Sequence, residues 1–329
     1  MHPWCRPQED IAVPIMLSPQ DVDDVFDDES FLEERFADVQ RLLLESRHPP
    51  GADTLVSVPS SRLRLTVRPD VPGPLGRCST IRIDPSPPAP AAPATGRVEL
   101  VLADDGSLLG LADAGALDDW RAAVPSGLAA RYLAPPGPQA LGLFGAGAQA
   151  WACLLVLRRA LPSLAVVRVV GRDRAGAKDF ALAAGRHTGL KVVADDDPRT
   201  GARHADVVVA TGGHPPVRAD WLTAGALLID QTDTTRQAFP PRPARPTIRS
   251  VRLAPAGRAS AVPDAGTPDC LALGEIVAGR ALPRRAGADV LHYRSDDLAG
   301  WDTTAAAAGL RQAWRRDLGT ALPVGRTYR

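Results

Sequence analysis

The stretch "LGLFGAGAQA", residues 141–150, decides the fold of this chain. An apolar run of strand length leads into Gly145 and Gly147, and a helical pattern follows them, so a strand, a tight turn and a helix are expected. Gly145 permits the turn, while Gly147 lets the backbone approach a pyrophosphate at the positive end of the helix. The third glycine of the usual pattern is replaced by Ala150, which is tolerated because that position governs only helix packing. The stretch predicts a dinucleotide-binding turn.

Strand and helix patterns alternate along the chain after residue 140. Apolar runs of strand length include "LAVVRVV" (164–170), "ADVVVAT" (205–211) and "ALLID" (226–230), and segments of helical pattern separate them. Continuous apolar strands that alternate with helices indicate a parallel sheet that is covered on both faces. We therefore predict a Rossmann-type doubly wound α/β domain that binds the nucleotide.

The part of the chain before this domain has a different pattern. Strand signals run from Thr54 to Asp113, and Asp-Asp-Gly at residues 104–106 predicts a hairpin between two of the strands. Pro125 interrupts a helical segment, in which a kink or break is expected. A final helix is expected from about Trp301 to Leu318. We predict a mixed α/β domain with antiparallel strands over residues 1–130 plus 303–329, and the nucleotide domain over residues 131–302.

Composition limits the possible classes of function. Of the 329 residues 45% are hydrophobic, as in soluble globular proteins, and no apolar run is long enough to span a bilayer. The formal net charge is +0 without a basic stripe, which argues against a nucleic acid partner. The amino terminus lacks the layout of a signal peptide, and the four cysteines lie far apart without metal-ligand spacing. These features predict a cytoplasmic protein that has no metal site and binds a small molecule.

The residues after the second predicted strand of the nucleotide domain bear on the choice of cofactor. A site that prefers NAD usually places an acidic residue at that strand end, where it binds the ribose 2′-hydroxyl. This chain has Gly171, followed by Arg172, Asp173 and Arg174. The two arginines could pair with a 2′-phosphate. We therefore favour NADP(H) over NAD(H).

Several motifs together resemble those of the ornithine cyclodeaminase/mu-crystallin family. The turn "GAGAQA" (145–150) matches the family's GxGxQA, in which Gln149 and Ala150 are expected. The resemblance extends from about Leu17 to Leu322. Its other motifs are "WRAAVPSGLAARYLA" (120–134), "VVVATGGHPPVRADWLTAGALLID" (207–230) and "LGEIVAGRALPRR" (273–285).

This resemblance implies a homodimer and hydride transfer at nicotinamide C4. The expected activity is that of an NAD(P)-dependent oxidoreductase that acts on a C–N bond of an amino or imino acid. An imine reductase, an amino-acid dehydrogenase and an opine-type enzyme all fit this description. One alternative is a cyclodeaminase that forms a cyclic imino acid and releases ammonia. A second alternative is a non-enzymatic NADPH-binding protein.

The resemblance also implies roles for individual residues. Arg121 matches an arginine that grips the substrate carboxylate, and a second such arginine falls at Arg62 or Arg64. Asp233 matches an aspartate that assists proton transfer, although Asp230 is close enough to confuse the register. The predicted cofactor contacts are Gly145, Gly147, Ala148, Gln149, Arg172, Asp173, Arg174, Thr211 and Ser295.

The expected substrate site departs from the family pattern at one lysine. That lysine falls at Cys78 or Ser79, and neither side chain can hold a carboxylate as an ammonium group does. Arg77 or Arg82 could substitute for it sterically, and we count Arg77 among the predicted substrate contacts. An arginine will not deprotonate, however, so it cannot shuttle protons in place of the lysine.

Overall fold

The structure is a computed structural model in which the chain forms two compact units. The first unit comprises residues 1–38, 48–121 and 299–329, and the second comprises residues 39–47 and 122–298. The domain boundaries expected from the sequence, at residues 130 and 302, stay a prediction. The described residues are 13–45, 53–58, 63–85, 96–212, 217–232, 248–256, 270–295 and 298–323.

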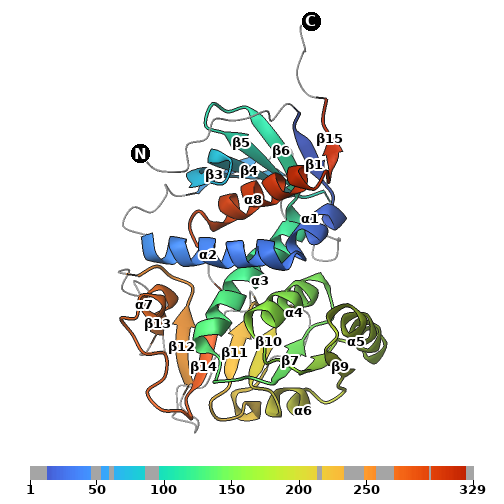
Figure 1. Cartoon of the computed structure of the whole chain (residues 1–329), viewed down its shortest axis with the longest axis vertical. Coiled ribbons are helices and arrows are strands. Elements are labelled where there is room, and N and C mark those ends of the chain that lie inside the picture. Colours follow the sequence, from blue (N-terminus) through green and yellow to red (C-terminus); the bar gives the residue numbers. More distant parts are fainter. Residues whose placement is uncertain are drawn as a thin grey trace, which may run out of the picture. The chain divides into compact units, whose positions relative to one another are not determined.

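The second unit is built on a sheet with the strand order β13-β12-β14-β11-β10-β7-β8-β9 (Figure 1). All neighbouring strands pair in parallel, which confirms the sequence prediction. The order reverses between β7 and β10, as in a doubly wound fold. The strands are β7 (Ala140–Phe144), β8 (Val166–Val170), β9 (Lys191–Ala194), β10 (Val207–Ala210), β11 (Leu227–Asp230), β12 (Ile248–Arg252), β13 (Cys270–Ala272) and β14 (Val290–Arg294).

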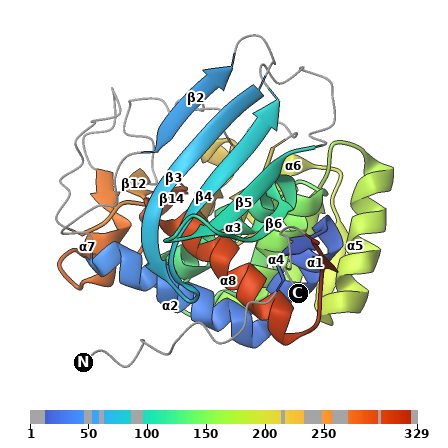
Figure 2. The same cartoon turned by 90° about the horizontal axis from the view of Figure 1, so that it is seen from above.

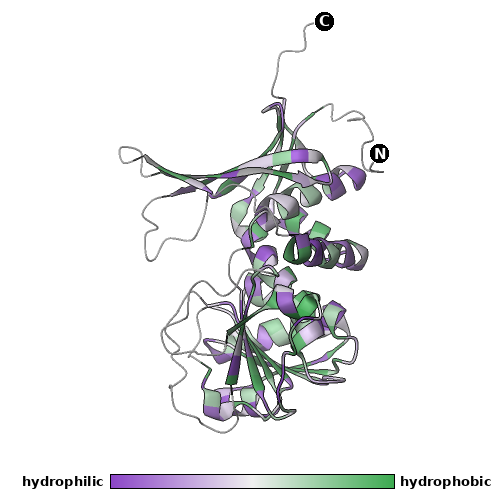
Figure 3. Ribbon diagram, turned by 90° about the vertical axis from the view of Figure 1, so that its left-hand side faces the viewer, coloured by the Kyte–Doolittle hydropathy of each residue, from purple (hydrophilic) through white to green (hydrophobic). Residues whose placement is uncertain are grey.

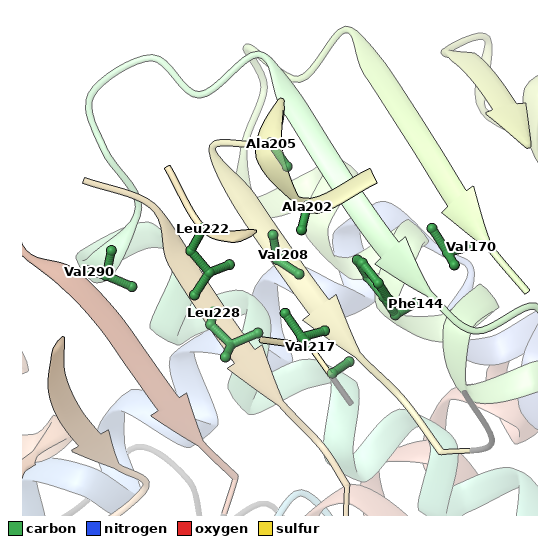
Figure 4. Packing of buried hydrophobic residues seen from close by; sticks show 10 residues of the cluster. Phe144, Val170, Ala202, Ala205, Val208, Val217, Leu222, Leu228 and Val290 are labelled. Carbon is green, nitrogen blue, oxygen red and sulfur yellow. The ribbon is translucent and has the colours of Figure 1, made fainter. Parts of the chain in front are cut away.

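The central strands of this sheet are apolar because both of their faces are covered. Every residue of β10 and β11 is buried, and these strands are largely green in Figure 3. One cluster joins Phe144, Val208 and Leu228 of the sheet to Ala202 and Ala205 (Figure 4). The helical elements of this unit are α4 (Ala148–Ala160), α5 (Arg174–Thr188), α6 (Pro198–Arg203), η1 (Ala219–Trp221) and α7 (Leu273–Val277).

The first unit has a sheet with the strand order β15-β1-β6-β5-β4-β3-β2, whose long strands β3 and β4 lie side by side in Figure 2. Its neighbours are antiparallel except for β1 and β6. The predicted hairpin is confirmed by β5 and β6, with Gly106 at a φ of 81° in the turn. The strands are β1 (Ile15–Leu17), β2 (Thr54–Val58), β3 (Leu63–Gly73), β4 (Gly76–Pro85), β5 (Val98–Ala103), β6 (Leu108–Asp113) and β15 (Thr320–Ala321).

Helices cover one side of this sheet. The helix expected near the end of the chain is α8 (Trp301–Arg315), and it packs against β3, β4 and β5. Before it in the chain come α1 (Pro19–Phe26), α2 (Glu29–Glu45) and α3 (Ala114–Leu133). None of the helices in the described part of the chain is both long enough and apolar enough to cross a membrane.

Helix α3 runs without a break through Pro125, so the break expected from the sequence does not occur. Proline has no N–H group, and the carbonyl four residues earlier in the helix therefore loses its usual donor. That carbonyl belongs to Arg121, and it accepts a hydrogen bond from the indole Nε1 of Trp301 at 3.0 Å. Because the indole is buried, it replaces the missing helical bond where water cannot.

Acidic side chains gather near the start of α3. The pKa of Asp119 is raised to about 7. Burial is the largest cause, and the neighbouring carboxylates of Asp118, Asp23 and Asp113 add to it. Asp23 on α1 also accepts a hydrogen bond from the Trp120 indole at 2.8 Å. The folded chain therefore binds a proton at Asp119 more tightly than the unfolded chain does.

We expect Trp301→Phe to lower the free energy of unfolding by about 1–3 kcal/mol, because it leaves the Arg121 carbonyl buried without a donor. In a Pro125→Ala background the helix N–H is restored, so the same substitution should cost less. Urea unfolding of the four proteins of this double-mutant cycle measures the coupling. Equal losses in the two backgrounds would contradict the compensation.

The raised pKa of Asp119 predicts a pH-dependent stability. A carboxyl group whose pKa is higher in the folded than in the unfolded chain stabilises the fold at low pH. This stabilisation is lost as the pH rises from the ordinary pKa of an aspartate, 3.8, to the raised pKa of about 7. Asp119→Asn should therefore raise the melting temperature at pH 8 relative to the natural chain, with little gain at pH 5. Asp105→Asn is the control, since hydrogen bonds from Ser107 lower the pKa of Asp105. A gain for Asp119→Asn that is equal at both pH values would refute the assignment.

Candidate functional site

The strand register of the second unit brings the ends of its parallel strands to one edge of the sheet. Phe144 of β7 pairs with Val170 of β8 and Ala210 of β10, and the ladder continues at the same level to β11 and β14. In doubly wound folds ligands bind outside these carboxyl ends, near the point where the strand order reverses. We call this border the carboxyl edge. The residues that follow its strands are Gly145, Gly171, Thr211, Gln231 and Ser295.

The turn after β7 requires a glycine at Gly145. Its φ is 136°, and its N–H donates a hydrogen bond to the Val170 carbonyl at 2.9 Å. A Cβ at this position would collide with the hydroxyl of Thr211. That hydroxyl is itself held in place, because it donates to the Phe144 carbonyl at 2.9 Å. Thr211 therefore shapes the turn, and its contact with a cofactor stays a prediction.

Gly147 opens the turn toward the start of α4. It is the N-cap residue of the helix, and no side chain caps the helix there. Among the described residues, no atom lies within 4 Å of a Cβ built on Gly147. The first N–H groups of a helix have no helical acceptors, so this end of α4 suits an anion. Ala148 begins the helix, and Gln149 Oε1 accepts a hydrogen bond from the Gly212 N–H at 3.5 Å.

The residues after β8 lie at the same edge. An added Cβ on Gly171 would come within 3.0 Å of the Ala177 Cβ, so close packing against α5 favours glycine there. Asp173 is the N-cap of α5, and its Oδ1 accepts a hydrogen bond from the Gly176 N–H at 2.8 Å. Arg174 Nε lies 3.0 Å from Asp196 Oδ2, while the Arg172 side chain is exposed. Asp173 thus has a structural role that sequence reasoning did not anticipate.

A buried carboxylate stands where β11 ends. The Oδ1 atom of Asp230 accepts hydrogen bonds from the Thr232 N–H at 3.0 Å and from its hydroxyl at 2.6 Å. Its Oδ2 lies 3.5 Å from Nε2 of His292 on β14. Burial raises the pKa of Asp230, but the hydrogen bonds from His292 and Thr232 outweigh burial and hold it below its usual range. Asp233, the predicted proton-transfer residue, lies outside the described residues.

The sheet of the first unit carries charged side chains on the side covered by helices. Arg68 pairs directly with Thr80, and Arg82 pairs directly with Glu99, so strand alternation places all four on one side. Arg82 binds Asp118 of α3 through two parallel hydrogen bonds, at 2.6 and 2.7 Å. We call the whole set the polar face. Its charged members are Arg68, Arg82, Asp84, Arg97, Glu99, Asp118, Arg121 and Asp302.

Arg121, the predicted carboxylate anchor, is paired within the polar face. Its Nη1 donates to Glu99 Oε2 at 2.7 Å, and its Nη2 donates to the backbone carbonyl of Asp302 at 3.1 Å. Glu99 is 0% exposed and Arg121 only 5%. Burial raises the pKa of Glu99, but the guanidinium groups of Arg121 and Arg68 outweigh burial and lower it, so the pair is ionised. Its predicted contact with substrate stays a prediction.

The other predicted substrate contacts lie in different places. Arg62 lies outside the described residues, while Arg64 and Arg77 are exposed. Sequence reasoning missed Arg68 as a candidate site residue, although strand alternation from Arg64 would have placed it on the same side of the sheet. Arg82, the steric alternative to Arg77, belongs to the polar face. The remaining positions named for the family lysine lie on β4, where Cys78 is buried and Ser79 half-buried.

Ser295 follows β14 and is half-buried at the carboxyl edge.

The described residues contain no group of three or more histidine, cysteine, aspartate or glutamate side chains placed to hold a metal ion. Three of the four cysteines, Cys78, Cys153 and Cys270, are described, and none of the three is in a disulfide bond. The described carboxyl edge therefore offers a glycine turn, a helix N-terminus and a buried carboxylate.

Comparisons with known proteins agree with this arrangement. Residues 88–234 match the model of the ornithine cyclodeaminase/mu-crystallin family. A protein of Rhizobium meliloti (strain 1021), provisionally named a dehydrogenase, is 37% identical over 117 residues. That match covers 35% of this chain and 35% of the relative, so the chain spans only about a third of the curated protein that it matches.

Solved structures share the fold over almost the whole chain. Thermococcus litoralis Δ1-pyrroline-2-carboxylate reductase, in complex with NADH and L-proline, is 19% identical with a TM-score of 0.69, covering 94% of this chain and 100% of that one. A probable ornithine cyclodeaminase of Bordetella pertussis Tohama I is 22% identical with a TM-score of 0.69, covering 93% and 99%. The iminosuccinate reductase of Paracoccus denitrificans with NAD+ is 14% identical with a TM-score of 0.69, covering 95% and 100%. Residues 88–234 are thus similar to the ornithine cyclodeaminase/mu-crystallin family, and the chain shares its fold with these solved structures.

Proposed function

We propose that the chain is an NAD(P)(H)-dependent oxidoreductase that acts on a C–N bond of an amino or imino acid or of a compound derived from one. The observation that carries this proposal is the glycine turn between β7 and α4, where Gly147 leaves open space at an uncapped helix N-terminus. The names of similar structures, a pyrroline-carboxylate reductase and an iminosuccinate reductase, support imine chemistry. Imine reductase, amino-acid dehydrogenase and opine-type activities all fit the proposal.

The residues of the turn fit a dinucleotide. The N–H groups at the start of α4 would hold the pyrophosphate, and Gly147 has no side chain to block its approach. The cofactor would supply or accept the hydride at nicotinamide C4. The protein would exclude water, orient the substrate and move protons at the reacting nitrogen. We assign proton transfer to Asp233, which follows Asp230 by three residues in the sequence.

The choice of cofactor and the assembly are further parts of the proposal. We propose NADP(H) in preference to NAD(H), because Arg172 is exposed just after β8 and its guanidinium group would pair with a 2′-phosphate. The similar structures whose names include a cofactor bind NADH or NAD. A cytoplasmic homodimer is also proposed, and the archaeal alanine dehydrogenase of the same fold is described as a dimer.

One other activity has support from a specific comparison. A lysine cyclodeaminase has the same fold with a TM-score of 0.67 and 22% identity, covering 95% of this chain and 96% of that one. A cyclodeaminase would return the hydride to its product, so ammonia would appear without net change in the cofactor. A protein that only binds NADPH would change the fluorescence of the cofactor and turn over no amine or imine.

The first test measures oxidation of NADPH and NADH with cyclic imines and with pairs of keto acid and amine. We expect net consumption of reduced cofactor. Gly147→Ala should raise the Kd for NADPH by about tenfold or more, because the added methyl group would lie where the pyrophosphate approaches the backbone. Gly287→Ala is the matched control, since a Cβ there also meets open space among the described residues. Ammonia release without net consumption would favour the cyclodeaminase instead.

The second test concerns the 2′-phosphate. Arg172→Ala should weaken NADPH binding by about 1.5–3 kcal/mol, because a charge-assisted hydrogen bond is lost, while NADH binding stays unchanged. Arg186→Ala, at an exposed position in the last turn of α5, serves as the control. Fluorescence titration with both cofactors measures the difference. An equal loss of affinity for the two cofactors would argue against binding of the 2′-phosphate by Arg172.

A further inference from the structure

The charges of the polar face are already matched with one another. Each of its four arginines has a carboxylate partner within the first unit. The ion-pair distances include 2.7 Å from Arg68 to Asp302, 2.6 Å from Arg82 to Asp118, 2.9 Å from Arg97 Nε to Asp84, and 2.7 Å from Arg121 to Glu99. Arg97 also pairs with Asp118. A carboxylate that enters this face therefore finds its arginines already paired, and it must compete with a built-in carboxylate.

Glu99 is the strongest of these competitors. It is completely buried, and it holds both Arg121 at 2.7 Å and Arg68 at 3.3 Å. A substrate carboxylate that took Arg121 would leave Glu99 buried with only the longer contact. Removing one partner of a buried ion pair is strongly destabilising, because the remaining charge stays buried without compensation.

The two most exposed charges of the polar face are carboxylates. The side chains of Asp118 and Asp302 are 33% and 31% exposed, whereas Arg121 is 5% exposed and Arg68 13%. A ligand that approaches this face therefore meets carboxylates before it meets guanidinium groups. Such a surface attracts an ammonium or iminium cation and repels a carboxylate.

The two lysines and the exposed arginines of the described sheet do not change this balance. The only two lysines, Lys178 and Lys191, both belong to the second unit. In the first unit Arg64 and Arg77 are exposed to water, where a pair with a carboxylate contributes little. Arg35 lies 2.8 Å from Asp38.

Resting on the proposed oxidoreductase function, we infer that Glu99 is a specificity-determining residue that excludes free carboxylates from Arg121. The substrate that this face fits is a cationic amine or iminium compound whose carbon next to the reacting centre carries no free carboxylate. Amides, esters and plain cyclic amines or imines share this property. Neutral carbonyl oxygens of such compounds can still accept a hydrogen bond without displacing Glu99.

Two matched ligand pairs test the inference on the full chain. Calorimetry in the presence of NADP+ compares pyrrolidine with L-proline, and turnover with NADPH compares 1-pyrroline with Δ1-pyrroline-2-carboxylate. The natural chain should favour the carboxylate-free member by about tenfold or more in each pair. Glu99→Gln keeps the shape of the side chain but removes its charge, so the preference should shift toward the carboxylate by a similar factor. Asp105→Asn, which removes an acid from the exposed turn between β5 and β6, outside the polar face, should leave the preference unchanged.

The outcomes separate this inference from the proposed function. Selective binding of pyrrolidine without any turnover would overturn the oxidoreductase proposal and leave the role of Glu99 standing. Turnover with a preference of the natural chain for the carboxylate would overturn the role of Glu99 and leave the oxidoreductase. If Glu99→Gln fails to fold, the natural chain's preference within the two pairs decides the question. Failure of both ligands to bind to any folded protein in the set overturns the inference as well.

Discussion

The parallel register of β7 with β8 and β10 is the constraint on which the second unit depends. It sets Phe144, Val170 and Ala210 level with one another, so the chain must turn at the same height after each strand. At that height Gly145 is held between the Val170 carbonyl and the Thr211 hydroxyl. The start of α4 then lies beside the carboxyl edge because the turn is too tight to place it elsewhere. A dinucleotide site in this fold is thus a consequence of strand register.

A different kind of interaction organises the first unit. Its sheet presents arginines and carboxylates to α3 and α8, where most domains would present apolar side chains. Burial of these charges is tolerated because each is paired, as Arg121 is with Glu99. The same helix contains Pro125, and the carbonyl that this proline leaves without a donor is satisfied by Trp301. These polar groups therefore find partners on side chains that come from distant parts of the sequence.

Sequence reasoning succeeded where local patterns carry the information. The strand, turn and helix around Gly147 and the hairpin at Gly106 follow from residue types in adjacent positions. It was less complete for side chains whose partners are far away. The pairing of Arg121 with Glu99 joins residues that are 22 positions apart, and nothing in the local sequence of α3 predicts it. The capping of α5 by Asp173 was missed for a different reason, since an aspartate at a strand end suits both a ribose and a helix start.

The sequence by itself determined the fold class, the position of the glycine turn and the resemblance to the family. These properties depend on hydrophobic periodicity and on glycines, which act over a few residues. Only the tertiary structure decided which charged side chains are already paired within the protein. The sequence predicts Arg121 as an anchor for a substrate carboxylate, but folding places it, together with Arg68, beside Glu99, which is completely buried. The physical reason is that ion pairing depends on distance in space and on the exclusion of water, and both quantities arise only when the strands and helices pack together.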